Sequence, residues 1–207
     1  MNLWRSQAAA LAPERIADIF WGEIPPCEHL VQLYSDDAAF LDLLVNFVAG
    51  GLAGGESVIL LATREHIAAL DARLGARDLD IAAAREREHY ITIDAESALA
   101  GFMVDGWPDD ERFERFVVEL LQRARHGGRR VRAFGELVAL LWAQGNSGAT
   151  VRLEHLWHRI CHEHGFPLLC AYPRTGFLQG PADAARAICA AHSHTLPEVG
   201  RAHALAG

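Results

Sequence analysis

The sequence contains no lysine, and all 19 of its basic residues are arginines, set against 27 acidic residues. Without lysine, the chain cannot form a Schiff base with a substrate carbonyl, and it cannot supply the lysine that holds the phosphates in a P-loop. The formal net charge of −8 disfavours nucleic acids and anionic membranes as partners, because both bind clustered cations. We therefore expect neither a nucleic-acid partner nor a membrane partner.

Long apolar runs and paired cysteines are also absent. The longest apolar runs, such as residues 58–62, are far shorter than the roughly 20 residues that cross a bilayer. The four cysteines form no CxxC pair, so a zinc knuckle is not indicated. The first residues do not follow the order of a secretory signal. We expect a cytoplasmic protein with reduced cysteines.

The composition is that of a folded domain, with 51% hydrophobic and 22% charged residues in a chain of 207. This length fits one hydrophobic core, and a second independent core is not expected. Residues 27–197 are predicted to form that domain. Residues 1–26 read as a helical extension that ends at Pro25 and Pro26, and residues 198–207 read as a flexible tail.

Short apolar runs alternate with helical patterns from residue 27 onward, which is typical of βαβ units. The sequence therefore predicts a three-layer, doubly wound α/β fold with a mainly parallel sheet. Strands are expected at residues 29–37, 56–63, 89–95, 129–136 and 167–173. Helices are expected at residues 37–52, 64–74, 109–128, 137–145, 149–164 and 182–194.

Ligands in doubly wound folds bind beyond the carboxyl ends of the strands, so the residues at those ends are the candidate ligand-binding site. They are Tyr34, Ser35, Asp36, Asp37, Thr63, Arg64, His66, Asp94, Glu136, Tyr172 and Arg174. Trp142, in an apolar helix, is a further candidate wall for an apolar cavity. The pattern indicates no catalytic residues and no cofactor.

Three of these acidic positions have a second interpretation. Asp36, Asp37 and Glu136 each precede a predicted helix, where an acidic side chain stabilises the helix N-terminus. Capping is the preferred role for Asp37. For Glu136, an ion pair with Arg64 or Arg174 and a direct ligand contact remain equal alternatives.

The histidines and cysteines do not form a familiar catalytic or metal motif. His158 and His162 stand four residues apart on a helix, but without HExxH the preferred interpretation is a solvated face. The same reasoning covers His192 with His194, and Cys27 with His29. Cys170 lies within an apolar strand and is expected to behave as a small hydrophobe, with a redox role as the alternative.

Four segments, in their order and spacing, resemble the MEDS domain, a sensory module of methanogen and methylotroph regulators. They lie at residues 29–37; 51–63; 131–146 with 152–160; and 168–173 with 188–194. The resemblance implies a degenerate RecA-like fold, related to P-loop ATPases, that has lost the phosphate loop. It also implies sensing of small, often apolar molecules, and a protein partner such as a histidine kinase, a transcriptional regulator or an anti-sigma-type protein.

The residues after the first strand agree with a loss of nucleotide binding. A working P-loop would read GxxxxGK[ST] there, whereas this chain has Tyr34, Ser35, Asp36 and Asp37. Two carboxylates at this place would repel a triphosphate. ATP hydrolysis is therefore not expected.

Three functions follow as hypotheses. The first is a non-catalytic regulatory domain that binds a small ligand or a signalling partner and relays the signal by a change of conformation. The second is a metal-assisted hydrolase that uses Asp36, Asp37 and histidines. The third is a structural adaptor, in which Trp4, Phe20 and Trp21 of the N-terminal extension dock on a partner or form a homo-oligomer.

Overall fold

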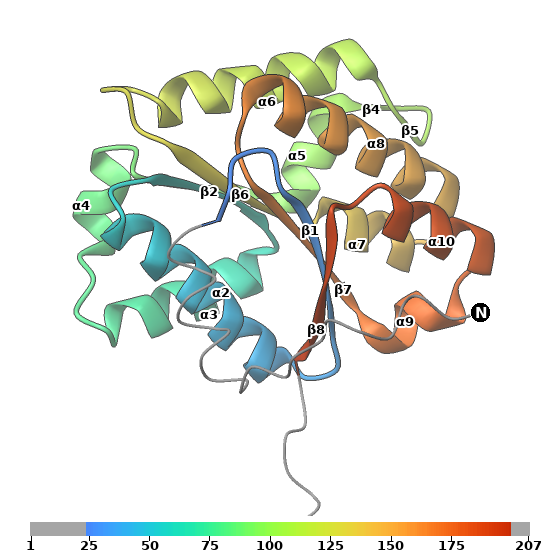
Figure 1. Ribbon diagram of the computed structural model, residues 1–207, viewed down its shortest axis with the longest axis horizontal. Helices are drawn as coiled ribbons and strands as arrows, with labels where there is room; N and C mark the ends of the chain where they lie inside the picture. Colours follow the sequence, from blue (N-terminus) through green and yellow to red (C-terminus); the bar gives the residue numbers. More distant parts are fainter. Residues whose placement is uncertain (1–23, 200–207) are drawn as a thin grey trace, which may run out of the picture.

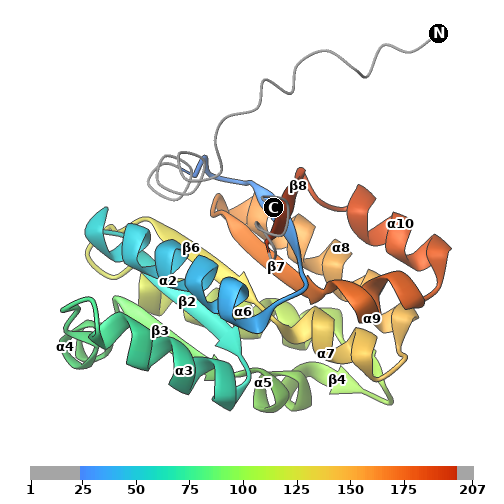
Figure 2. The same cartoon turned by 90° about the horizontal axis from the view of Figure 1, so that it is seen from below.

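A computed structural model describes residues 24–199 as a six-stranded sheet with helices on both faces (Figures 1 and 2). The strand order is β3-β2-β6-β7-β1-β8, and every neighbouring pair is parallel. The strands are β1 (His29–Tyr34), β2 (Ser57–Ala62), β3 (Tyr90–Asp94), β6 (Val131–Gly135), β7 (Leu168–Pro173) and β8 (His194–Val199). The predicted three-layer α/β fold with a parallel sheet is confirmed.

The helices divide between the two faces of the sheet (Figure 2). One face carries α2 (Asp37–Ala53), α3 (Arg64–Gly75) and α4 (Ile81–Glu86). The other carries α5 (Ala95–Phe102), α6 (Asp110–Ala124), α7 (Leu137–Ala143), α8 (Ser147–His164), α9 (Arg174–Gln179) and α10 (Ala182–Ala190). A small hairpin of β4 (Met103–Val104) and β5 (Trp107–Pro108) joins α5 to α6.

Strand residues alternate between two separate cores, because successive side chains of a strand point to opposite faces. In β2, Val58 and Leu60 belong to the core beneath α2 and α3, whereas Ile59 and Leu61 belong to the core beneath α5 to α8. Both faces are covered, which explains why these strands are apolar along their whole length. The same alternation places Tyr34 and Tyr172 on opposite faces of the sheet.

Side-chain caps fix where the helices begin. The carboxylate of Asp109 accepts a hydrogen bond from the backbone N–H of Arg112, so α6 starts where the sequence predicts. Its predicted apolar face is buried through Phe113, Val117, Leu120, Leu121 and Ala124. The caps of α2, α3, α4, α5 and α8 are Asp36, Thr63, Asp80, Asp94 and Asn146.

The C-terminal part differs from the prediction. The last helix ends at Ala190 rather than at residue 194, and residues 194–199 form β8 instead of a helix end and a tail. Pro197 and the exposed polar residues around it hide this strand in the sequence. Its pairing partner is β1, about 165 residues earlier in the chain, so long-range pairing rather than local preference produces it.

A buried ion pair crosses the end of the sheet where β2 and β6 begin. Arg132 of β6 is fully buried, and its guanidinium bonds the carboxylate of Glu56 and, at 3.0 Å, the carbonyl oxygen of Phe47. The guanidinium also lies 5.3 Å from the centre of the Phe47 ring. Gly51 of α2 makes room for it, because a Cβ there would meet Arg132 at 2.8 Å.

The two predicted end segments of the chain lie mostly outside the residues that the structure describes. The helix predicted over residues 1–26 lies outside the described residues except for its last three, and so does most of the predicted tail at 198–207. Among residues 24–199, no helix combines the length and the apolar character needed to cross a bilayer.

Candidate functional site

The carboxyl ends of β1, β2 and β6 bring together four of the predicted site residues, which we call the strand-end cluster: Tyr34, Thr63, His66 and Glu136. One carboxylate oxygen of Glu136 accepts a hydrogen bond of 2.9 Å from the backbone N–H of Thr63. The other lies 2.8 Å from Nδ1 of His66. The Glu136 side chain is 7% exposed and that of His66 is 20% exposed, so the pair is screened from water but reachable.

Aromatic rings form the apolar side of the strand-end cluster. The ring of Phe40 stacks on Tyr34 with centroids 4.2 Å apart and meets the edge of His66 at 5.3 Å. Burial, then Glu136 and Asp37, raise the pKa of Tyr34. The hydrogen bond with Glu136 raises the pKa of His66 against the opposing effect of burial. The imidazole therefore holds a proton more readily than a free histidine does.

The two expected partners of Glu136 bond other residues instead. Arg64 lies 3.2 Å from the carboxylate of Asp94, and Arg174 lies 3.2 Å from that of Glu198. Of the two alternatives for Glu136, the ion pair with Arg64 or Arg174 is therefore wrong, and the direct ligand contact stays a prediction. The reason is local, because α3 starts at Arg64 and carries His66, not Arg64, over the end of β6.

The acidic pair after β1 acts at the start of α2. Asp36 is the cap, and its carboxylate accepts a 2.9 Å hydrogen bond from the backbone N–H of Ala39, while Asp37 is the first residue of the helix. Both side chains are exposed. The capping role preferred for Asp37 belongs to its neighbour Asp36. The hydroxyl of Ser35 donates to Glu198 at the end of β8.

Removal of this cap gives a direct test. We expect Asp36→Ala to lower the free energy of unfolding by about 0.5–2 kcal/mol, because an N–H at the start of α2 loses its acceptor. Denaturant unfolding followed by circular dichroism measures the change. Asp37→Ala is the matched control and should have a smaller effect, since no side-chain cap bond is lost; an equal loss in both variants would contradict the capping role.

Trp142 and Tyr172 lie away from the strand-end cluster, on the other face of the sheet. The indole N–H of Trp142 donates to the carbonyl oxygen of Gly176 at 2.9 Å, and its ring stacks on Phe177. The hydroxyl of Tyr172 donates to Glu154. These two residues therefore do not line the same site as Tyr34 and Glu136.

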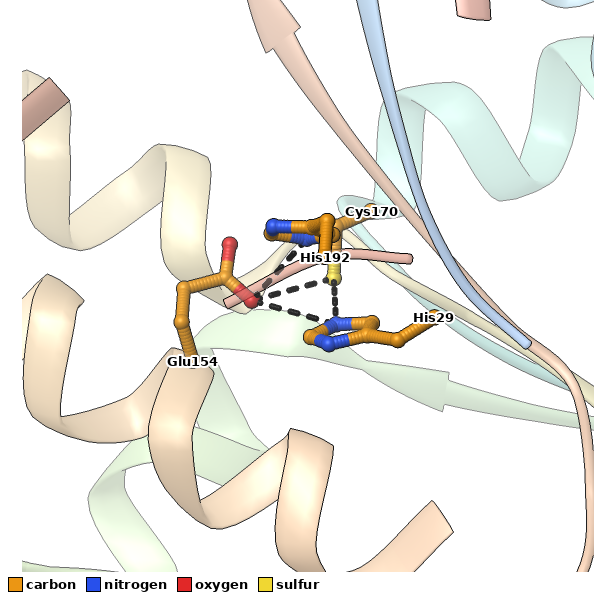
Figure 3. A group of neighbouring side chains, drawn as sticks. All are labelled: His29, Glu154, Cys170 and His192. Carbon is orange, nitrogen blue, oxygen red and sulfur yellow. Dashed lines mark hydrogen bonds and ion pairs between the residues drawn. The ribbon is translucent and has the colours of Figure 1, made fainter. Parts of the chain in front are cut away.

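A second group of polar side chains, which we call the buried quartet, lies inside the core beneath α8 (Figure 3). It consists of His29, Glu154, Cys170 and His192, which come from β1, α8, β7 and the turn after α10. The side chains of both histidines and Glu154 are fully buried, and so is Cys170. One Glu154 oxygen lies 3.3 Å from Nε2 of His29 and 3.4 Å from Nε2 of His192.

Electrostatics in the buried quartet favour an ionised Glu154 carboxylate and a protonated Cys170 thiol. Burial acts to raise the pKa of Glu154, but His192, His29 and the Tyr172 hydroxyl outweigh it and lower the pKa to about 2. Burial lowers the pKa of His192, against the effect of Glu154. Burial and Glu154 also raise the pKa of the Cys170 thiol well above its usual value.

The sequence reasoning named three members of the buried quartet without joining them. The sequence predicts Cys170 as a core residue with a redox alternative, and it places His29 beside Cys27 and His192 beside His194. Glu154 was missed. A usable signal was its position, because an acidic residue stands among the buried positions Leu153, Leu156 and Trp157 of α8.

The expectation of a solvated surface holds in part for the histidines of α8 and for His194. His155 and His162 are exposed and His158 is partly buried, with its ring 4.5 Å from that of His162. His194 is exposed and lies 3.4 Å from Glu28. The thiol of Cys27 contacts the backbone oxygen of His162. None of these residues is a member of the buried quartet.

Hollows on the surface occur at the amino ends of the strands, opposite the strand-end cluster. One has a volume of about 270 Å³ and is lined by Leu52, Leu79, Asp80, Ala83, Ala84, Arg87 and His89. Another, of about 490 Å³, is lined by Glu86, Arg87, Glu88, His89, His126 and Arg129. Both hollows are open to solvent, and Arg87 and His89 line both of them. Neither hollow includes a predicted site residue.

The comparison with protein families agrees with the segments singled out in the sequence. Residues 28–193 match the family model described as MEDS: MEthanogen/methylotroph, DcmR Sensory domain. This match covers β1 to α10 and so includes both the strand-end cluster and the buried quartet. A search of curated proteins finds no match. The family match spans most of the 207 residues, and the chain belongs to the MEDS family of sensory domains.

Proposed function

We propose that this MEDS domain senses a small molecule at the strand-end cluster and relays its binding through α3. The observation that carries the proposal is the His66–Glu136 pair, which connects the start of α3 to the end of β6. Ligands of doubly wound folds bind at this edge of the sheet. The pair is close enough to the surface for a ligand to reach it.

The chemistry of the cluster suits a molecule with an apolar body and one hydrogen-bond donor. Tyr34 and Phe40 offer aromatic surface, and the carboxylate of Glu136 accepts from a hydroxyl or an ammonium group. Such a group would compete with Thr63 N–H and His66 for the same oxygens. The start of α3 would then lose its tie to β6, which gives two conformations whose populations the ligand can shift.

This role needs no catalytic step, but it needs a protein that receives the signal. The chain belongs to a family of sensory domains, which supports a regulatory role without catalysis. We propose a protein partner of the histidine-kinase, regulator or anti-sigma type in the cytoplasm. We also propose that residues 27–197 act as the sensory unit, with the N-terminal extension and the tail outside it. The hydrolase and adaptor alternatives gain no specific support from the described residues.

Ligand binding is tested first by native mass spectrometry of the protein purified from its own host, followed by thermal unfolding with a panel of short-chain alcohols and amines. A ligand must raise the melting temperature of the wild-type protein, because it binds the native state. Glu136→Gln should abolish the shift. Glu114→Gln, an exposed glutamate of α6, should keep it, and an equal shift in all three proteins would refute the proposed site.

The raised pKa of His66 predicts how stability depends on pH. The charged His66–Glu136 pair contributes fully below the unfolded pKa of histidine, which is about 6.5, and this contribution is lost as pH rises through the higher folded pKa. We expect the stability difference between wild type and His66→Gln to be largest at acidic pH and to shrink on the alkaline side. Urea titrations at several pH values measure it. A difference that grows with pH would contradict the pairing.

A further inference from the structure

The buried quartet of His29, Glu154, Cys170 and His192 has the composition and the shape of a metal site. Four elements supply one ligand atom each: β1, α8, β7 and the turn after α10 (Figure 3). The four atoms lie within 4.8 Å of one another. Polar side chains are rarely buried together without a shared partner, because each loses its contact with water.

Both imidazoles turn Nε2 toward the carboxylate at the centre of the buried quartet. Nδ1 of His29 lies 3.1 Å from the carbonyl oxygen of Ala191, and Nδ1 of His192 lies 2.7 Å from that of Ile188. A carbonyl oxygen only accepts, so in each ring Nδ1 carries the proton and donates it. In the neutral form of each ring, Nε2 is then the nitrogen that bears a lone pair. This arrangement, with the far nitrogen bonded to a backbone carbonyl, is that of histidines that bind metals.

Without a cation the centre of the buried quartet holds more acceptors than donors. With both rings neutral, the two Nε2 atoms and a Glu154 oxygen are all acceptors, and the single thiol of Cys170 has one proton to share among them. Nε2 of His192 is buried and makes no hydrogen bond. The two imidazole rings are also close, with centroids 3.9 Å apart, which disfavours a positive charge on both. A bound cation would satisfy every acceptor at once.

The spacing of the ligand atoms fits tetrahedral zinc. Bonds of about 2.0–2.1 Å to nitrogen or oxygen and about 2.3 Å to sulfur separate nitrogen from oxygen by about 3.3 Å, and sulfur from either by about 3.6 Å. Glu154 lies 3.3 and 3.4 Å from the two imidazole nitrogens. The Cys170 sulfur lies 3.5 Å from His29 Nε2 and 3.5 Å from the same Glu154 oxygen. These four separations match four of the six edges of such a tetrahedron, and the other two pairs of atoms lie within 4.8 Å.

We propose that the buried quartet binds one zinc-class divalent transition ion through His29, Glu154, Cys170 and His192. A carboxylate, a thiolate and two neutral imidazoles around a doubly charged ion make a site with no net charge, which suits full burial. Magnesium and calcium are disfavoured, because they take oxygen ligands. Four protein ligands leave no open position, so the site is structural rather than catalytic.

The ion fastens the C-terminal edge of the sheet to its interior. His192 stands two residues before β8, and the adjacent Ser193 N–H bonds the carbonyl oxygen of His29 at 2.7 Å. The backbone N–H of His29 in turn bonds the Ser193 hydroxyl at 3.1 Å. The metal thus adds two ligands from α8 and β7 to a junction that already joins β1 to β8. This inference stands independently of the strand-end ligand site.

The test is the metal content and the coordination of the untagged, full-length protein, purified without chelators from cells supplied with zinc. Inductively coupled plasma mass spectrometry should find about one zinc ion per chain. Replacement of zinc by cobalt should give the visible absorption of a tetrahedral site and a thiolate-to-cobalt charge-transfer band. X-ray absorption spectroscopy of the zinc-bound protein should show one sulfur and three nitrogen or oxygen neighbours around the metal. This measurement uses the wild-type protein, so it does not depend on whether a variant folds.

Matched variants assign the ligands. Cys170→Ser should remove the charge-transfer band, and His192→Gln should lower the affinity for zinc at least about tenfold. Cys189→Ser and His194→Gln, whose side chains are exposed, should keep metal content and spectrum. Two results would overturn the proposal: a folded, metal-free protein whose melting temperature zinc does not change, or a zinc site without a sulfur neighbour.

Discussion

Glu56→Ala is expected to lower the free energy of unfolding by about 3–5 kcal/mol, since it removes the carboxylate that pairs with the charge of a buried arginine. Arg132 is fully buried and Glu56 is 5% exposed. Small domains are stable by only about 5–15 kcal/mol, so the variant should lose a large part of its stability. Urea unfolding followed by circular dichroism and by tryptophan fluorescence measures the change.

Two further variants test whether the loss of stability comes from the burial of the ion pair rather than from the loss of any ion pair. Glu88→Ala breaks an ion pair with Arg123 in which both side chains are well exposed, and it should cost about 0–1 kcal/mol. The double variant Glu56→Ala with Arg132→Met removes both charges and should be more stable than Glu56→Ala alone. If Glu56→Ala matched the Glu88→Ala control, the buried pair would not support the sheet as described.

Phe40→Ala is expected to cost about 3–5 kcal/mol, the range for removal of a fully buried aromatic side chain. The Phe40 ring is 0% exposed and contacts the rings of Tyr34, His66 and Phe134. Its loss opens a cavity next to the strand-end cluster. We therefore expect a second effect, a weaker dependence of stability on the protonation of His66, which a pH series of urea titrations would reveal.

Leu178→Ala is the matched control, because Leu178 is an exposed apolar residue on α9. Its effect should stay within about 0.5 kcal/mol, as for most surface substitutions. A small effect of Phe40→Ala, comparable with this control, would mean that α2 packs on the sheet without the contact. A large loss of stability with unchanged pH dependence would instead separate the role of Phe40 in the core from its role beside His66.

The central strands were predictable from the sequence because they are apolar on both faces. The runs that became β2 and β7 have no polar alternation to confuse them with surface strands, and the cap Asp109 marked the start of α6. β8 was not predictable in this way, since its stability comes from pairing with β1 and not from its own residues. The short hairpin after α5 was missed for a different reason: its turn at Asp105 and Gly106 is local, but each of its strands has only two residues, too few to show an alternating pattern.

The site residues were predictable only where topology alone decides their position. Thr63, His66 and Glu136 follow β2 and β6, and neighbouring parallel strands must bring such residues together. The choice of His66 over Arg64 as the partner of Glu136 depends on how α3 begins. The members of the buried quartet come from four elements that are far apart in the sequence, so no local spacing predicts the cluster. Only the folded structure shows that the four side chains meet.

The place of β1 in the sheet has a consequence for how the chain acquires its structure during synthesis. Of the strands within residues 24–199, β1 is made before the others, yet its two neighbours in the sheet, β7 and β8, are made after all the others. Until they appear, the backbone of β1 has no strand to pair with in the finished arrangement. We therefore expect slow folding, with a long period in which His29 and its apolar neighbours are open to chaperones.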